Sequence, residues 1–164
     1  MGAAMVDGVA EFRRFMYTTV PAAVRTAARD ALEEGADELV SMVKALAPVG
    51  DGALRASIGW TWGEPPKGSI ALDDIAPAED PSMRIVVYAG SEEAFYARWV
   101  EFGTQPHSVA KGADISVKGK RRFQGGAQHP GAAAHPFFWP AYDVLKSKIR
   151  GRITRAINKA IRSL

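Results

Sequence analysis

The three histidines are the side chains best suited to bind a metal ion or transfer a proton. His107, His129 and His135 all lie in one long glycine-rich stretch. A metal site needs ligands on a rigid frame, supported by further hydrogen bonds, and such a stretch does not provide that frame. The histidines therefore predict no metal site.

The acidic side chains that could act in catalysis occur as adjacent pairs, Asp73 with Asp74 and Glu92 with Glu93. Neighbouring carboxylates do not face each other across a cleft, as a general acid and its base must. The sequence has no cysteine, which excludes a thiolate nucleophile, a thiolate zinc site and a disulfide. It also lacks a phosphate-binding loop, a dinucleotide-binding motif and a nucleophile elbow. We therefore expect no enzymatic activity and no cofactor.

The composition is that of a globular domain. The chain has 164 residues, of which 47% are hydrophobic and 24% are charged, and a chain of this length buries about 70% of its unfolded surface. It has no run of 18 apolar residues, so we expect no membrane span. Its first residues lack the basic start and apolar block of a secretion signal.

The charges are segregated although the net charge is only +3. Five acids and one base lie between residues 64 and 83, and five bases and one acid lie between residues 105 and 135. From residue 146 to residue 164 there are seven bases and no acid. Segregation of this kind is typical of a protein that binds partners.

Apolar spacing predicts four helices. Residues 5–16 form a short one, and residues 21–46 carry an apolar stripe along an amphipathic helix of about seven turns. A third helix covers residues 92–102 and ends at Gly103 in the left-handed conformation. The last one starts at residue 137, and we expect its stripe to pack on the sheet and on the long helix.

Strands are predicted at residues 54–62, where apolar and polar residues alternate, and at residues 84–89. A further short strand is possible near residues 115–117. We expect the connections 63–83 and 105–135 to be mobile loops, because long connections are unusual inside a compact domain.

These elements predict an α+β fold. A small antiparallel or mixed β-sheet packs against a long N-terminal helix and a C-terminal helix. We expect residues 1–18 to form a helical extension and residues 19–164 to form one domain.

Nine large aromatic residues lie near the ends of predicted elements. Phe137, Phe138 and Trp139 are consecutive, so no single face of a helix or strand can bury all three. Because aromatic side chains anchor interfaces, we expect at least one of them to reach another element or another chain.

Three segments together resemble a known family. The first, Ala47–Ile58, contains a glycine-rich turn and Leu-Arg-x-Ser-Ile. The second, Tyr96–Thr104, reads Tyr-Ala-x-x-Val-Glu-Phe-Gly-Thr, and the third, His135–Ala141, reads His-Pro-Phe-Phe-Trp-Pro-Ala. In this order they resemble the tail-completion or neck proteins of long-tailed phages, the Hong Kong-97-type gene-product-ten family, which also occurs in prophages and phage-derived particles. The resemblance covers roughly residues 20–160.

The resemblance implies a structural virion subunit at the head–tail junction, assembled in the cytoplasm of a bacterial host. Such a subunit would form a ring, expected to be hexameric, that closes the tail tube and joins it to the head connector. Its partners would be copies of itself, a head-closure or connector protein and the tail tube protein. DNA would pass through the channel without specific binding. The motif positions expected to be structural are Gly50, Leu54, Arg55, Glu101, Gly103, Pro136 and Pro140.

Assembly contacts are expected from the aromatic triple and from basic residues of the second loop and the last helix. These residues are Phe137, Phe138, Trp139, Lys120, Arg121, Arg122, Arg155, Lys159 and Arg162. A carboxylate in the last turn of a helix is disfavoured by the helix dipole, so we also expect a cation, Arg98 or Arg55, to hold Glu101.

Two other functions fit parts of the sequence. The calculated isoelectric point of 9.3 and the basic C-terminal helix allow a nucleic-acid-binding protein, whose affinity would fall steeply with salt. A small enzyme using the acidic loop is the third possibility.

Overall fold

The computed structural model describes residues 18–71, 83–108, 116–117, 120–121 and 128–164. The predicted helix at 5–16 and most of the acidic loop lie outside these residues. The helices are α2 (Val20–Leu46), α3 (Ala53–Ala56), α4 (Ala97–Phe102) and α5 (Phe138–Arg162). The strands are β1 (Gly59–Trp62), β2 (Ile70–Ala71), β3 (Ile85–Ala89), β4 (His107–Ser108), β5 (Ser116–Val117), β6 (Lys120–Arg121) and β7 (Gln128–His129).

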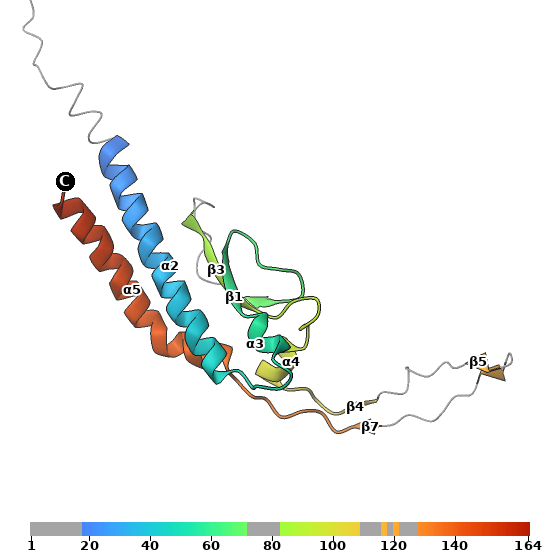
Figure 1. The fold of residues 1–164 in the computed structure, drawn as a ribbon. Helices are drawn as coiled ribbons and strands as arrows, with labels where there is room; N and C mark the ends of the chain where they lie inside the picture. Colours follow the sequence, from blue (N-terminus) through green and yellow to red (C-terminus); the bar gives the residue numbers. More distant parts are fainter. Residues whose placement is uncertain (1–17, 72–82, 109–115, 118–119, 122–127) are drawn as a thin grey trace, which may run out of the picture.

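The two long helices run side by side in opposite directions, and α2 lies between α5 and the sheet (Figure 1). A proline in its first turn begins α2, where the missing N–H costs no hydrogen bond. Its predicted apolar stripe is buried at Ala28, Ala31, Ala36, Leu39 and Val43. The sequence therefore predicted α2 and its inward face correctly.

The sheet is antiparallel, in the order β1-β3-β2, with Gly59 opposite Tyr88 and Trp62 opposite Ile85. Trp60 and Trp62 fix it to α2. Their indole N–H groups donate to Asp37 at 2.7 Å and to Glu33 at 2.9 Å. The α+β prediction is thus confirmed.

The first predicted strand is shorter than expected, because residues 53–56 form helix α3. Gly50 and Gly52 both have positive φ, at 38° and 86°, and Asp51 lies between them in the turn that the Gly52 N–H closes onto the Val49 carbonyl. The Asp51 carboxylate accepts a hydrogen bond from the Ala53 N–H at 3.0 Å, which favours a helical turn. The strand therefore begins only at Gly59.

The predicted contact of α5 with the sheet is limited to its first turns. Phe138, Ala141 and Leu145 join a core cluster that includes Val87 and Ala89 of β3. Farther along, α5 packs on α2. The helices approach closely there, since a Cβ added to Gly35 would lie 2.9 Å from the Ile149 Cγ2.

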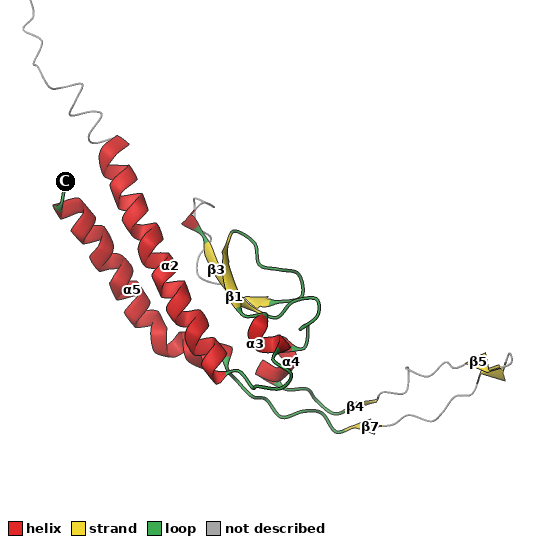
Figure 2. Cartoon of the chain, in the orientation of Figure 1, coloured by secondary structure: helices red, strands yellow, loops and turns green. Residues whose placement is uncertain are grey.

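The described ends of the predicted loop 105–135 are paired. His107 lies opposite His129 and Thr104 opposite Ala132, and this pair of strands leads away from the sheet and the long helices (Figure 2). Strand β5 confirms the expected short strand and pairs with β6. The expectation of mobility concerns mostly residues outside the described part.

No helix in the described part of the chain is long and apolar enough to cross a membrane.

Candidate assembly site

Glu101 joins α4 to the start of α5. It is the one charged residue among the buried side chains that the structure describes, with 2% of its surface exposed. One carboxylate oxygen, Oε2, accepts the backbone N–H groups of Phe137 at 2.8 Å and Phe138 at 2.9 Å. The other, Oε1, accepts the N–H of Trp139 at 3.1 Å.

These bonds satisfy the whole N-terminus of α5. The first four N–H groups of a helix have no partner inside the helix, and Phe137 has no side chain that could cap them. Glu101 accepts three of these groups, and the fourth position is Pro140, which has no N–H. The carboxylate also lies at the positive end of the α5 dipole, where a negative charge is favoured.

The expected cation partner of Glu101 is therefore wrong for the part of the chain that the structure describes. Arg98 is exposed, and the Arg55 Nε donates to the carbonyl of Ala47 at 3.1 Å. The dipole at the C-terminal end of α4 disfavours this carboxylate. The favourable charge comes from the start of α5, which lies 36 residues later in the sequence.

Close backbone packing also joins the end of α4 to the segment that precedes α5. Gly103 has a φ of 70°, and a Cβ added there would lie 2.7 Å from the Ala132 carbonyl oxygen and 2.8 Å from the Ala134 nitrogen. The His135 N–H donates to the Val100 carbonyl at 2.7 Å. The second and third motifs thus form one joint, in which residues far apart in sequence support each other.

The first motif forms the turn that follows α2 and the short helix α3. Leu54 is buried, and Arg55 ties the turn to the end of α2. The Ser57 hydroxyl accepts the Gly90 N–H at 3.0 Å, which connects the motif to the end of β3. Residues of all three motifs therefore have structural roles in the fold.

The comparison with protein families agrees with the motifs. The family model described as "Bacteriophage HK97-gp10, putative tail-component" matches residues 10–103, which is more than half of the chain. The chain belongs to this family. The match covers the first motif and all but the last residue of the second, and the third motif follows it. No curated protein and no solved structure matched.

Membership assigns a coarse function. The family description names a tail component of a bacteriophage, so this HK97 gp10-like chain is a structural component of a phage tail and part of a virion.

The aromatic triple divides into core and surface. Phe137 and Phe138 are buried, with 0% and 1% of their surface exposed, whereas Trp139 keeps 38%. Phe137 and Phe138 thus pack in the core of their own chain. They cannot contact another protein while that core is intact. Trp139 remains a candidate for an assembly contact.

Part of the basic C-terminal helix is neutralised by α2. Glu38 binds both Lys148 and Arg152, with the Arg152 Nη2 at 2.5 Å from its Oε2. Hydrogen bonds from Lys148 and then Arg152 lower the pKa of Glu38 below its usual value. Residues 146–164 contain no acid, and the acid that pairs with Lys148 and Arg152 belongs to α2.

The remaining predicted basic contacts lie mostly at the surface. Arg155, Lys159 and Arg162 are exposed on α5, and none of them forms an ion pair among the described residues. Lys120 and Arg121 form β6, and Arg122 lies outside the described residues. The interface role of all six stays a prediction.

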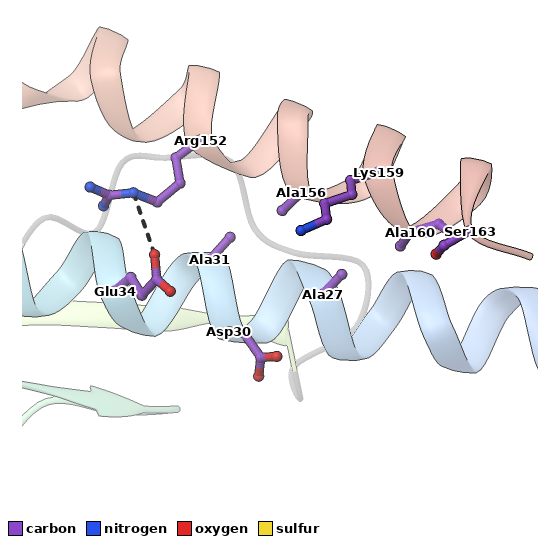
Figure 3. Close-up of a pocket in the computed structure, with 9 residues that line it drawn as sticks. All are labelled: Ala27, Asp30, Ala31, Glu34, Arg152, Ala156, Lys159, Ala160 and Ser163. Atoms are coloured by element: carbon purple, nitrogen blue, oxygen red, sulfur yellow. Dashed lines mark hydrogen bonds and ion pairs between the residues drawn. The ribbon is translucent and has the colours of Figure 1, made fainter.

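A shallow groove of about 320 Å³ separates the far ends of α2 and α5 (Figure 3). Its walls include the small side chains Ala27, Ala31, Ala156 and Ala160. At one end, the Arg152 Nε lies 3.6 Å from a Glu34 carboxylate oxygen. The alanine methyl groups of these walls cannot act as an acid or a base. Two of the charged side chains at the groove, Arg152 and Glu34, form an ion pair with each other.

Of the three histidines, His135 belongs to the joint between α4 and α5, through its backbone N–H. His107 and His129 stack with ring centroids 5.0 Å apart, and His135 is exposed. Within the described ranges, no group of three or more His, Cys, Asp or Glu is placed to hold a metal ion.

Sequence reasoning missed the outer face of α4. Phe95, Trp99 and Phe102 keep 53%, 51% and 56% of their surface exposed. Their spacing of four and three residues is the signal that could have revealed one shared helix face.

Proposed function

We propose that this chain is a neck subunit that completes the tail. In this proposal it forms a six-fold ring that closes the upper end of the tail tube and joins it to the head connector. The ring leaves a channel for DNA. The chain acts as a structural part and not as an enzyme, and residues 19–164 form its domain with residues 1–18 as an extension.

Family membership is the observation that carries this proposal. A ring also needs two different complementary surfaces on each subunit. The exposed basic residues Arg155, Lys159 and Arg162 lie toward one end of the helix pair, and α4 lies beside the other end (Figure 1). A subunit with distinct surfaces at its two ends suits a head-to-tail ring.

Partners above and below the ring would be the connector or head-closure protein and the tail tube protein. The DNA inside the channel must be released quickly, so we propose that the ring does not grip phosphates. The pairing of Lys148 and Arg152 with Glu38 supports this proposal, because these two cations are already occupied.

Particle production without this chain tests the function. We expect filled heads and separate tails to accumulate, and the wild-type chain supplied in trans should restore joined particles. Joined, infectious particles made in the complete absence of the chain would contradict the proposal.

Nucleic-acid binding is the second candidate, favoured by the exposed basic residues Arg155, Lys159 and Arg162 of α5, which form no ion pair with the residues that the structure describes. A gel shift of the purified chain separates the two proposals. Binding that weakens steeply between low and physiological salt would favour nucleic-acid binding, and no shift at physiological salt would favour the neck subunit.

A further inference from the structure

Helix α4 and the turn before it bury two alanines and expose three large aromatic side chains. Ala94 and Ala97 have 1% and 0% of their surface exposed, whereas Phe95, Trp99 and Phe102 are about half exposed. These three aromatic residues, here called the aromatic face, form one stripe, and the Phe95 and Trp99 rings meet edge to face at 5.3 Å. Tyr96 and Val100 pack against the core, so the aromatic face lies on the outward side, where a surface helix usually carries polar residues.

The aromatic face is large enough to act as an interface. An aromatic side chain buries about 150–250 Å², so three half-exposed ones offer on the order of 300 Å² of apolar surface. Patches of this size on a monomer often mark an interaction site. The inward side of α4 is already held by Glu101 and Ala97, so the fold does not need the aromatic face.

We propose that the aromatic face binds residues 5–16 of a second copy of this chain. This inference rests on the proposed ring and names the contact between its subunits. Residues 5–16 carry an apolar stripe made of Val6, Val9, Phe12 and Met16.

Charge complementarity supports this partner. The N-terminal segment has Asp7 and Glu11 before Phe12, and Arg13 and Arg14 after it, and the exposed acids Glu92 and Glu93 precede the aromatic face. Arg98 lies next to Trp99 and would repel the two arginines. The docked segment should therefore lie with its arginines toward Glu92 and Glu93.

The position of α2 explains why the segment comes from another copy. Thr18 and Thr19 already have helical backbone and lead directly into α2. This helix of 27 residues is about 40 Å long, and α4 lies beside its far end (Figure 1). Residues 5–16 would form a helix of only about 18 Å, too short to return to the α4 of the same chain.

Complementary variants of the full-length chain test the contact. Phe12→Asp disables the segment, and Trp99→Ser disables the aromatic face. Each variant should lower the association constant about tenfold or more, as expected for loss of an aromatic anchor. An equimolar mixture should form heterodimers, because one intact segment then meets one intact aromatic face. Val144→Asp, at a site on α5 that is 67% exposed, is the control and should associate like the wild type.

Sedimentation velocity gives the result, with circular dichroism spectra and thermal unfolding to show that each variant is folded. Heterodimers formed only in the mixture would support the contact. A wild-type chain that stays monomeric, a variant that associates normally, or a mixture that stays monomeric would overturn it. Joining of heads and tails by Trp99→Ser chains would overturn this contact and leave the neck function intact.

Discussion

At the residue scale, Glu101 replaces the side-chain cap that α5 lacks. Its carboxylate satisfies three N–H groups, and Pro140 removes the need for a fourth acceptor. The sequence marks Glu101 and Pro140 as parts of two motifs but not as partners. Local rules relate a residue to neighbours within one or two turns, and this contact spans two segments that come together only in the folded chain.

Replacing Glu101 with Gln should destabilise the fold by about 1–3 kcal/mol. The glutamine side chain keeps one acceptor oxygen, but its NH₂ group would face a backbone N–H group. Two donors cannot form a hydrogen bond with each other, so at least one N–H group would lose its acceptor. Urea unfolding measures the loss, and Glu93→Gln, at an exposed site, is the matched control. Equal unfolding free energies for Glu101→Gln and the wild type would show that the cap contributes nothing.

Gly103→Ala should cost more than Gly52→Ala. Both glycines have positive φ, so both substitutions introduce backbone strain of about 1–3 kcal/mol. Only at Gly103 would the new Cβ meet backbone atoms within 4 Å, since nothing lies that close at Gly52. Thermal unfolding of the two variants isolates the effect of close packing, and similar melting temperatures would argue against a tight joint.

At the element scale, periodicity predicted both long helices, because each carries an apolar stripe over many turns. Periodicity failed at residues 53–56, because over four residues the apolar pattern of a strand does not differ from that of a single helical turn. The turn at Gly50 and Gly52 decided that case. Periodicity also could not show that α2 shields most of α5 from the sheet, because a stripe specifies which face is buried but not the element that covers it.

Truncations in α5 should follow this arrangement. Leu145 is 4% exposed and belongs to the core cluster, so Leu145→Ala should cost about 2–5 kcal/mol. Ile149 and Ile153 are only half buried, so Ile149→Ala should cost roughly 1–2 kcal/mol. Chemical denaturation of both variants checks the order, which would be reversed if α5 lay on the sheet along its length.

The bridge from Glu38 to α5 should weaken in acid. The pKa of Glu38 in the folded chain lies below its ordinary value of 4.5. Its contribution is therefore complete above pH 4.5 and is lost as the pH falls through the lowered pKa. Wild-type stability should fall more steeply than that of Glu38→Gln as the pH drops below 4.5. Parallel curves for the two proteins would exclude a role for this bridge.

At the scale of the whole molecule, two kinds of basic residue on α5 should behave differently. Arg155, Lys159 and Arg162 are exposed, so reversing all three to Glu should leave the chain folded and block head–tail joining. Reversing Lys148 and Arg152 instead places two acids beside Glu38 and should lower the melting temperature. Normal joining by the triple variant would show that its basic surface is only solvated.

The site was harder to predict than the fold. The motifs indicated the family. The surfaces proposed for assembly, however, depend on which aromatic side chains are buried in the core and which are exposed. Phe137 and Phe138 are buried in the core, whereas Phe95, Trp99 and Phe102 are exposed. Composition does not distinguish these two groups, because both are aromatic and both lie near helix ends.

The most direct test of the neck function is a cryo-electron microscopy reconstruction of intact particles that contain this chain with an added tag. We expect six copies in one ring between the head connector and the upper end of the tail tube, around an open channel. Copies spread along the tail or at its far tip, or no ring at the junction, would contradict it.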